Sequence, residues 1–134
     1  RDGTDALKKV ALMLLAKLVV KLAATIKRRP RRAAIELFVA LIRDGTDEQK
    51  ETAADALWEL LSVIAGRDRE VAIADAEDAG GIKPLVALVR EGTDAQKEKA
   101  AHALSWLAFN DGTKVAIADV GGIEPLVALV RDGT

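Results

Sequence analysis

Apolar residues recur at helical spacing along most of the chain. Between Asp47 and Ile64 they fall three or four positions apart, and the same spacing continues from Asp94 to Phe109. Such a period places apolar side chains on one face of a helix. The pattern therefore predicts two long helices over these ranges, and no segment shows the strict alternation that is typical of a half-buried strand.

Shorter helices are predicted between the long ones. Gly81 to Arg90 and Gly122 to Arg131 each have a proline in the first turn, where its missing N–H would have no helical partner in any case. The recurring sequence VAIAD predicts two further short helices, over Val71 to Ala76 and Val115 to Asp119. Each complete unit is thus expected to contain one short, one medium and one long helix.

The chain repeats itself with a period close to 42 residues. RDGT occurs three times and REGT once, at intervals of 42, 47 and 41 residues, and GGIKPLVALVREGTD from Gly80 matches GGIEPLVALVRDGT from Gly121. A repeat of this length, made only of helical patterns, indicates helices stacked into an all-α solenoid. We expect a single domain, divided into units at residues 1–42, 43–89 and 90–130 with a terminal turn at 131–134.

The RDGT motif is interpreted as a helix stop followed by a helix start. Arg is expected in the last helical turn, Gly in the left-handed conformation after it, and Thr as the N-cap of the next helix. Thr46 with Gln49 and Thr93 with Gln96 fit the capping box, in which the two residues satisfy each other's backbone N–H groups. Since copies of the motif also lie at both ends of the sequence, we expect two end units that each lack a neighbouring helix.

Three stretches form a recognisable combination, namely GGIEPLVALVRDGT, TDAQKEKAAHALSWLA and KVAIADVGG. With them the chain resembles the armadillo repeat family, strongly from Asp47 to Thr134 and weakly from Asp5 to Arg32. The resemblance implies a right-handed superhelix of about three three-helix units, whose long third helices line a concave groove for peptide or protein partners, without catalysis. Near-verbatim repeats beside one altered unit also suggest a consensus-like or engineered protein.

The resemblance implies which residues line the concave groove. They are acidic in the middle and include an aromatic residue at one end: Glu51, Asp55, Glu59, Glu98, His102 and Trp106. In many armadillo proteins an Asn on each third helix holds the peptide backbone, but the matching positions here are Lys17, Glu59 and Trp106. An acidic groove predicts binding of a basic peptide through charge-assisted hydrogen bonds. The alternative is an ordinary solvated helix face.

The segment from Asp5 to Arg29 contains neither Gly nor Pro and predicts one long helix. Apolar residues surround most of it, and Lys9, Lys17 and Lys21 form a narrow polar line. A helix of this kind needs burial, whereas the end units of a solenoid normally have a polar outer face. We therefore expect a homo-oligomer, most simply a two-fold dimer, with head-to-tail stacking as the alternative. The expected interface residues are Val10, Leu14, Leu15, Leu18, Val19, Leu22 and Ile26.

Composition narrows the function classes further. Of the 134 residues 50% are apolar, and 20 basic against 21 acidic residues give a formal net charge of −1. This balance provides no overall field that would attract nucleic acid or an anionic membrane. The absence of Cys excludes disulfides and thiolate metal sites. Lysines within the apolar stretch argue against a membrane segment, so a soluble, cytoplasmic-type protein is expected if the chain is natural.

Catalysis has no support in the sequence. His102 is the only histidine, and the nearby Ser105 has neither an orienting third group nor an oxyanion site. No cofactor or metal ion is expected. KRRPRR, from Lys27 to Arg32, is either a nuclear import signal, a nucleic-acid patch or a contact for an acidic partner, or a solvated connector in which Pro30 breaks the preceding helix. Because no aromatic residues are interleaved, we favour the connector, and the sequence predicts a non-catalytic, self-associating scaffold.

Overall fold

The computed structural model describes residues 2–133, and the side chains of residues 4–133. The described residues form eight helices and no strand: α1 (Asp2–Lys21), α2 (Arg28–Asp44), α3 (Asp47–Val63), α4 (Gly66–Asp78), α5 (Ile82–Glu91), α6 (Asp94–Leu107), α7 (Asp111–Asp119) and α8 (Ile123–Asp132). The predicted all-helical class is confirmed. The right-handed armadillo-type solenoid remains a prediction.

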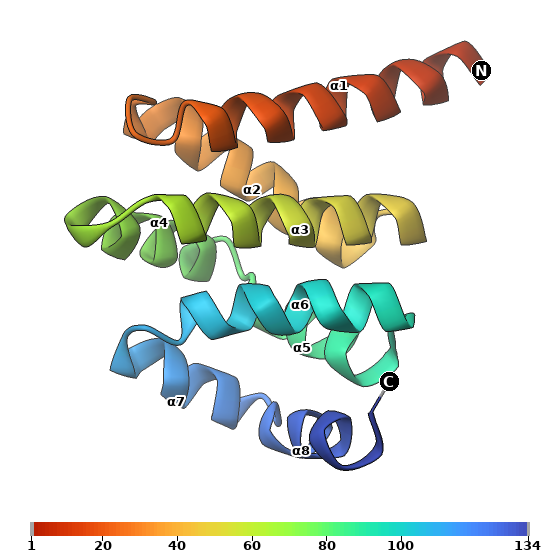
Figure 1. Ribbon diagram of the computed structural model, residues 1–134, viewed down its shortest axis with the longest axis vertical. Helices are drawn as coiled ribbons and strands as arrows, with labels where there is room; N and C mark the ends of the chain where they lie inside the picture. Colours follow the sequence, from red (N-terminus) through yellow and green to blue (C-terminus); the bar gives the residue numbers. More distant parts are fainter. Residues whose placement is uncertain (1, 134) are drawn as a thin grey trace.

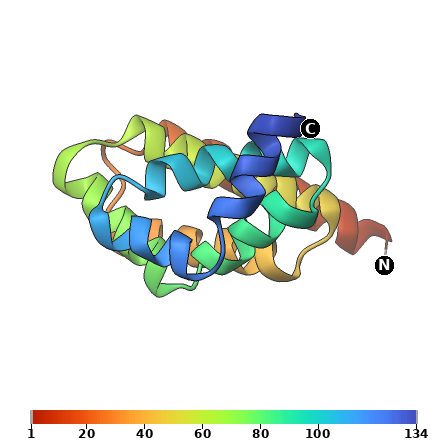
Figure 2. The same ribbon diagram turned by 90° about the horizontal axis from the view of Figure 1, so that it is seen from below.

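The helices α1, α3 and α6 lie side by side and run in the same direction (Figure 1). On one side of this layer α2 packs on α3 and α5 packs on α6, and together with the α3–α6 pair these are the most extensive contacts between helices. The helix α1 lies at one end of the stack and α8 at the other (Figure 1). Viewed from below, α8 is the helix nearest the reader and none of the others covers it (Figure 2).

The hydrophobic core occupies the middle of the stack. In α2, Ile35, Phe38 and Ile42 are almost completely buried, and so are Leu57 and Leu60 of α3, the helix on which α2 packs. Their spacing of three or four residues places them on one face of each helix, as the apolar pattern predicts. In α8 no residue is buried. The core therefore ends between α5 and α8.

Both predicted capping boxes are confirmed. The side chain of Thr46 accepts from the backbone N–H of Gln49, whose side chain accepts in return from the backbone N–H of Thr46, and Thr93 and Gln96 form the same pair. Because each box satisfies two N–H groups that the helix leaves free, it fixes where the helix begins. As predicted from these boxes, α3 begins at Asp47 and α6 at the residue after Thr93.

The glycines of the two central turns are not left-handed, contrary to the prediction. Gly45 has φ −78° and ψ 178°, and Gly92 has φ −76° and ψ 175°, which are extended conformations open to any residue. What the turn requires is space, since a Cβ on Gly45 would lie 2.5 Å from the carbonyl oxygen of Leu41 and one on Gly92 equally close to that of Leu88. Glycine is therefore needed here for a close approach of the chain.

The predicted single helix from Asp5 to Arg29 is wrong, because α1 ends at Lys21 and a turn follows it. Within this turn the hydroxyl of Thr25 donates to the carbonyl oxygen of Leu22. Pro30 then lies in the first turn of α2. In an uninterrupted helix its ring would clash with the carbonyl four residues earlier, whereas a first-turn proline is tolerated. The basic run KRRPRR thus begins a helix and is not a connector.

The first RDGT copy also differs from the expectation, whereas the last copy follows it as a helix stop. Asp2 and Thr4 belong to α1, so this copy forms no turn, and Arg1 lies outside the described residues. Leu7 occupies the position at which the capping boxes have Gln, and Thr4 therefore lacks the reciprocal partner that would hold it as an N-cap. The last copy ends α8 at Gly133, which is left-handed with φ 71°, and its Thr134 again lies outside the described residues.

The two short helices are longer than the VAIAD motif predicts. The helix α4 spans Gly66–Asp78, and α7 spans Asp111–Asp119. At the start of α7 the side chain of Asn110 accepts from the backbone N–H of Thr113 at 2.7 Å. Asn is among the preferred N-cap residues, and this cap starts the helix four residues before the motif.

Candidate functional site

The side of α1 that faces away from the core is a continuous apolar stripe. Counted along the helix its residues are three or four positions apart, which places them on one face. They are all exposed, by between 46% and 72%, and we name them the α1 ridge: Leu7, Val10, Leu14 and Leu18 of α1, and Leu22, the first residue after this helix. Single exposed apolar residues are ordinary, whereas a contiguous row of five is typical of interaction surfaces and makes this row a candidate site.

The ridge includes only part of the interface predicted from the sequence. Val10, Leu14, Leu18 and Leu22 are exposed as that prediction requires. Leu15 and Ile26 are partly buried and pack against the core of the chain itself. Val19 is 3% exposed and is itself a core residue, so its inclusion in an interface is wrong. An apolar pattern on all sides of a helix cannot reveal which side packs against α3.

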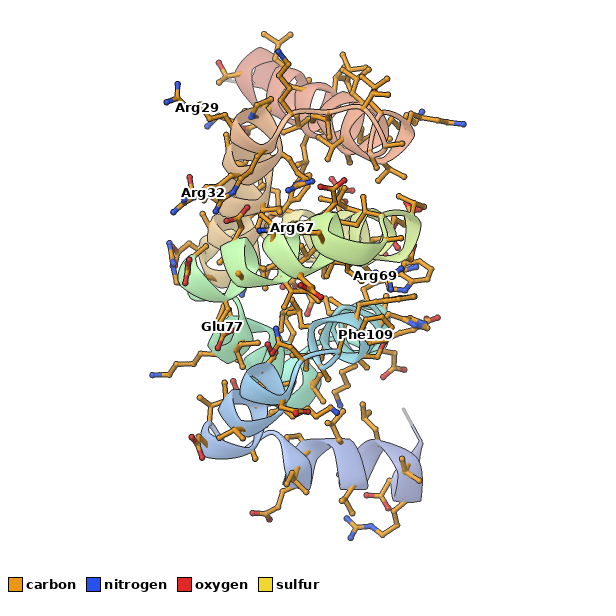
Figure 3. The ribbon with its side chains drawn as sticks, turned by 90° about the vertical axis from the view of Figure 1, so that its left-hand side faces the viewer. Arg29, Arg32, Arg67, Arg69, Glu77 and Phe109 are labelled. Carbon is orange, nitrogen blue, oxygen red and sulfur yellow. The ribbon has the colours of Figure 1, made fainter. Side chains whose placement is uncertain are left out.

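A second apolar surface lies at the opposite end of the stack. It lies on α8, and we name it the α8 face: the exposed Ile123, Val127 and Val130, and Leu126, which is partly buried and also packs against the core. These residues and Arg131 line a shallow cleft of about 400 Å³. Within the described residues no helix covers this face, and Figure 3 shows α8 set apart from the rest of the ribbon.

The predicted groove residues lie on α3 and α6 and are brought together in part. Asp55 of α3 pairs with Lys99 of α6, with 3.1 Å between Oδ1 and Nζ. Glu98 lies 3.9 Å from His102 on the same helix. Glu51 and Glu59 are half-buried, as is Asp55. The face is therefore acidic but partly neutralised by Lys99, a cation that the sequence analysis did not consider.

Aromatic side chains bind these helices to each other and to α4. Trp58 of α3 stacks against His102 of α6, with ring centroids 4.7 Å apart. Trp106 meets Phe109 edge to face at 5.0 Å. The guanidinium of Arg69 lies 4.5 Å from the ring centroid of Trp106 and 4.8 Å from that of Phe109, and Figure 3 shows Arg69 and Phe109 side by side. Such cation–π contacts are attractive, so Trp106, the aromatic residue predicted at one end of the groove, already binds a cation of the chain itself.

Two groups on the acidic face have shifted pKa values. Burial raises the pKa of the Glu59 carboxyl, the nearby Asp55 carboxylate raises it further, and Lys99 lowers it. The hydrogen bond to Asp55 raises the pKa of the Lys99 ammonium group. The ionised form of Glu59 is therefore destabilised in the folded chain, because burial removes part of its hydration.

A cleft of about 750 Å³ separates α1 from the first half of α3. Lys9 and Glu48 lie on opposite walls, 3.5 Å apart, and both are well exposed. Thr46 and Met13 also line the cleft. An exposed ion pair of this kind stabilises little, and the lining shows no group that is set up for chemistry.

The basic run is largely paired within the chain. Arg28 donates to the buried carboxylate of Asp75 in α4 at 2.9 Å, Arg31 lies 3.9 Å from Asp68, and Arg32 pairs with Glu36. The contact with Asp75 raises the pKa of the Arg28 guanidinium. Figure 3 shows the exposed Arg29 and Arg32 pointing outward from α2. The run thus fastens α2 to α4 more than it forms a site for an anion.

The described residues contain no metal site, membrane span or Ser–His pair. Within residues 2–133, no group of three or more His, Cys, Asp or Glu is placed to hold a metal ion. None of the helices in this range combines the length and apolarity that crossing a membrane requires. The hydroxyl of Ser105 donates to the carbonyl oxygen of His102 and makes no contact with its imidazole.

Comparison with known proteins finds no matching family model, and no curated protein or solved structure matches the chain significantly. The armadillo resemblance therefore stays a prediction that rests on the repeated motifs.

Proposed function

We propose that the chain is a non-catalytic helical scaffold that associates with itself through the α1 ridge. The observation that supports this most directly is the exposure of five large apolar side chains in one row, from Leu7 at 72% to Leu18 at 46%. Removing such a row from water favours association by about 25 cal/mol for each Å² of apolar surface. The armadillo-type superhelix is part of the same proposal, since stacked units bury apolar faces against each other, and an end unit without a polar outer face leaves such a face exposed.

The test compares a ridge variant with a matched control by size-exclusion chromatography with light scattering. Leu14→Glu with Leu18→Glu places two charges on the ridge, whereas Val63→Glu places one at an equally exposed valine of α3. We expect the wild type and the control to associate and the ridge variant to be a monomer, with unchanged helical circular dichroism in all three. A wild type that stays monomeric throughout the micromolar range contradicts the proposal.

A second candidate function is binding of an extended basic peptide on the face formed by α3 and α6. Its support is the raised pKa of Glu59, whose half-buried carboxylate lies near Asp55 and would gain from an added cation. Fluorescence anisotropy with a labelled arginine-rich peptide tests it. Replacing Glu51 and Glu59 with Gln should weaken binding, and Glu70→Gln on α4 should not. Equal affinities would remove this candidate.

A further inference from the structure

Apolar residues at equivalent positions of the repeat are exposed in one helix and buried in another. Ile123 of α8 occupies the position of Ile82 in α5, yet it is 60% exposed while Ile82 is 6% exposed. The same comparison gives 52% for Val127 against 2% for Val86. The sequences are nearly identical, so the difference comes from the neighbours. The helix α5 has α6 as its most extensive contact, and within the described residues α8 has no equivalent of α6.

Equivalent residues of α1 and α6 also differ in exposure. Counted from the RDGT and REGT motifs, Leu14 and Leu18 occupy the positions of Ala103 and Leu107 in α6. In α6 these two residues are completely buried, and the most extensive contacts of α6 are with α3 and α5. In α1 the matching residues belong to the exposed ridge. Within the described residues α1 thus lacks the helices that cover the same side of α6.

From these two comparisons we infer that the partner of the α1 ridge is the α8 end of a second copy of this chain, in a head-to-tail contact. This inference rests on the proposed self-association and names its geometry. In this contact α8 of one copy packs on α1 of the next copy, as α5 packs on α6 within the chain. Likewise α6 of the first copy lies beside α1 of the next copy, as α3 lies beside α6 within the chain. The α5–α6 pair within each chain is the template for the α8–α1 pair between chains.

Side-chain size on α6 is compatible with this contact. Counted from the turn, Ser105 of α6 stands where α3 has Trp58, which stacks on His102 of α6, and Ala108, just after α6, stands where α3 has Leu61. The side of α6 that would meet the next copy therefore has smaller side chains than the side of α3 that meets α6. The α1 ridge has a larger side chain at the matching place, because Leu14 stands where α3 and α6 have an alanine. Large side chains opposite small ones preserve close packing.

A two-fold dimer through α1 fits the surfaces less well. It would place ridge against ridge and leave the α8 face exposed, including Val130, which is 89% exposed although its equivalent Val89 is 2% exposed. A head-to-tail contact covers both apolar surfaces at once. Such contacts are heterologous, and unless the rotation closes a ring they continue into open-ended assemblies.

The test mixes two variants, each blocked at one surface. Leu14→Glu with Leu18→Glu blocks the ridge, Val127→Glu with Val130→Glu blocks the α8 face, and Val115→Glu changes an exposed valine of α7 as a control. All substituted side chains are exposed, and circular dichroism verifies that the helices persist. The mass of each sample is then measured by light scattering.

We expect each blocked variant to be a monomer by itself and the mixture to form a one-to-one heterodimer, because each variant supplies the surface that the other lacks. The control should associate as the wild type does. If the variant blocked at α8 still dimerises alone, the head-to-tail geometry is wrong while self-association stands. If the mixture remains monomeric although the wild type associates, the geometry is equally overturned. A monomeric wild type would overturn self-association itself.

Discussion

Gln96 of α6 donates through Nε2 to the main-chain oxygen of Asp47 at the start of α3, at 3.0 Å. The same side chain accepts through Oε1 from the backbone N–H of Thr93, so it completes its own capping box and joins the starts of two long helices. Gln49 forms the equivalent box in α3 but is half-buried, while Gln96 is 3% exposed. A comparison of the two glutamines therefore distinguishes the contribution of the cap, which both residues complete, from that of the contact between α3 and α6, which Gln96 makes.

Replacing Gln96 should cost more than replacing Gln49. For Gln96→Ala we expect a loss of about 1–3 kcal/mol in the free energy of unfolding, because a buried side chain that bonds to both Thr93 and Asp47 is removed. For Gln49→Ala a loss of about 0.5–1 kcal/mol is expected from the cap alone. Urea unfolding followed by circular dichroism measures both values. Equal losses would show that the bond to Asp47 contributes nothing.

A close approach of the chain at Gly92 predicts a second difference. Gly92→Ala puts a Cβ 2.5 Å from the carbonyl oxygen of Leu88, and the turn must distort to accept it, so the variant should be clearly less stable. Gly112, within α7, has no atom nearer than 3.7 Å to such a Cβ. Gly112→Ala should therefore stabilise the chain by up to about 1 kcal/mol, from helix propensity alone. Thermal unfolding compares the two, and an unchanged midpoint for Gly92→Ala would contradict the steric explanation.

The contact between Arg28 and Asp75 predicts a non-additive pair. Asp75 is 1% exposed, and its Oδ2 has no hydrogen-bond partner among the described residues. Arg28→Ala should lower stability because it leaves a buried carboxylate without its cation. Removing Asp75 as well should recover part of this loss. A double-mutant cycle measures the coupling, and purely additive effects would mean that the ion pair does not hold α2 on α4.

The acidic face predicts that Glu59→Gln stabilises the fold by an amount that depends on pH. Because the pKa of Glu59 is raised in the folded chain, its ionised form destabilises the fold above that pKa, and the cost disappears as the pH falls toward the ordinary value of 4.5. The variant should therefore be more stable than the wild type at neutral pH, and the difference should vanish in acid. Glu70→Gln, at an exposed position, serves as the control. A gain that is independent of pH would contradict the burial of Glu59.

The sequence was sufficient for the helices of the two close repeats, because the capping boxes and the first-turn prolines fix local structure. It was insufficient for α1. The break after Lys21 allows Pro30 to stand in the first turn of α2, and the exposed side of α1 depends on which face meets α3. The role of Asp75 was also unpredictable, since the second VAIAD copy ends in Asp119, which is exposed. Burial of one copy and exposure of the other follow from neighbours that local sequence does not encode.

The central claim is self-association by a head-to-tail contact, and sedimentation equilibrium of the wild type tests it most directly. The weight-average mass should rise from the 14.2 kDa of one chain and keep rising with concentration, without a plateau at twice that mass. A mass that levels off at the dimer would contradict the head-to-tail geometry. A mass that remains at 14.2 kDa at every concentration would contradict self-association as a whole.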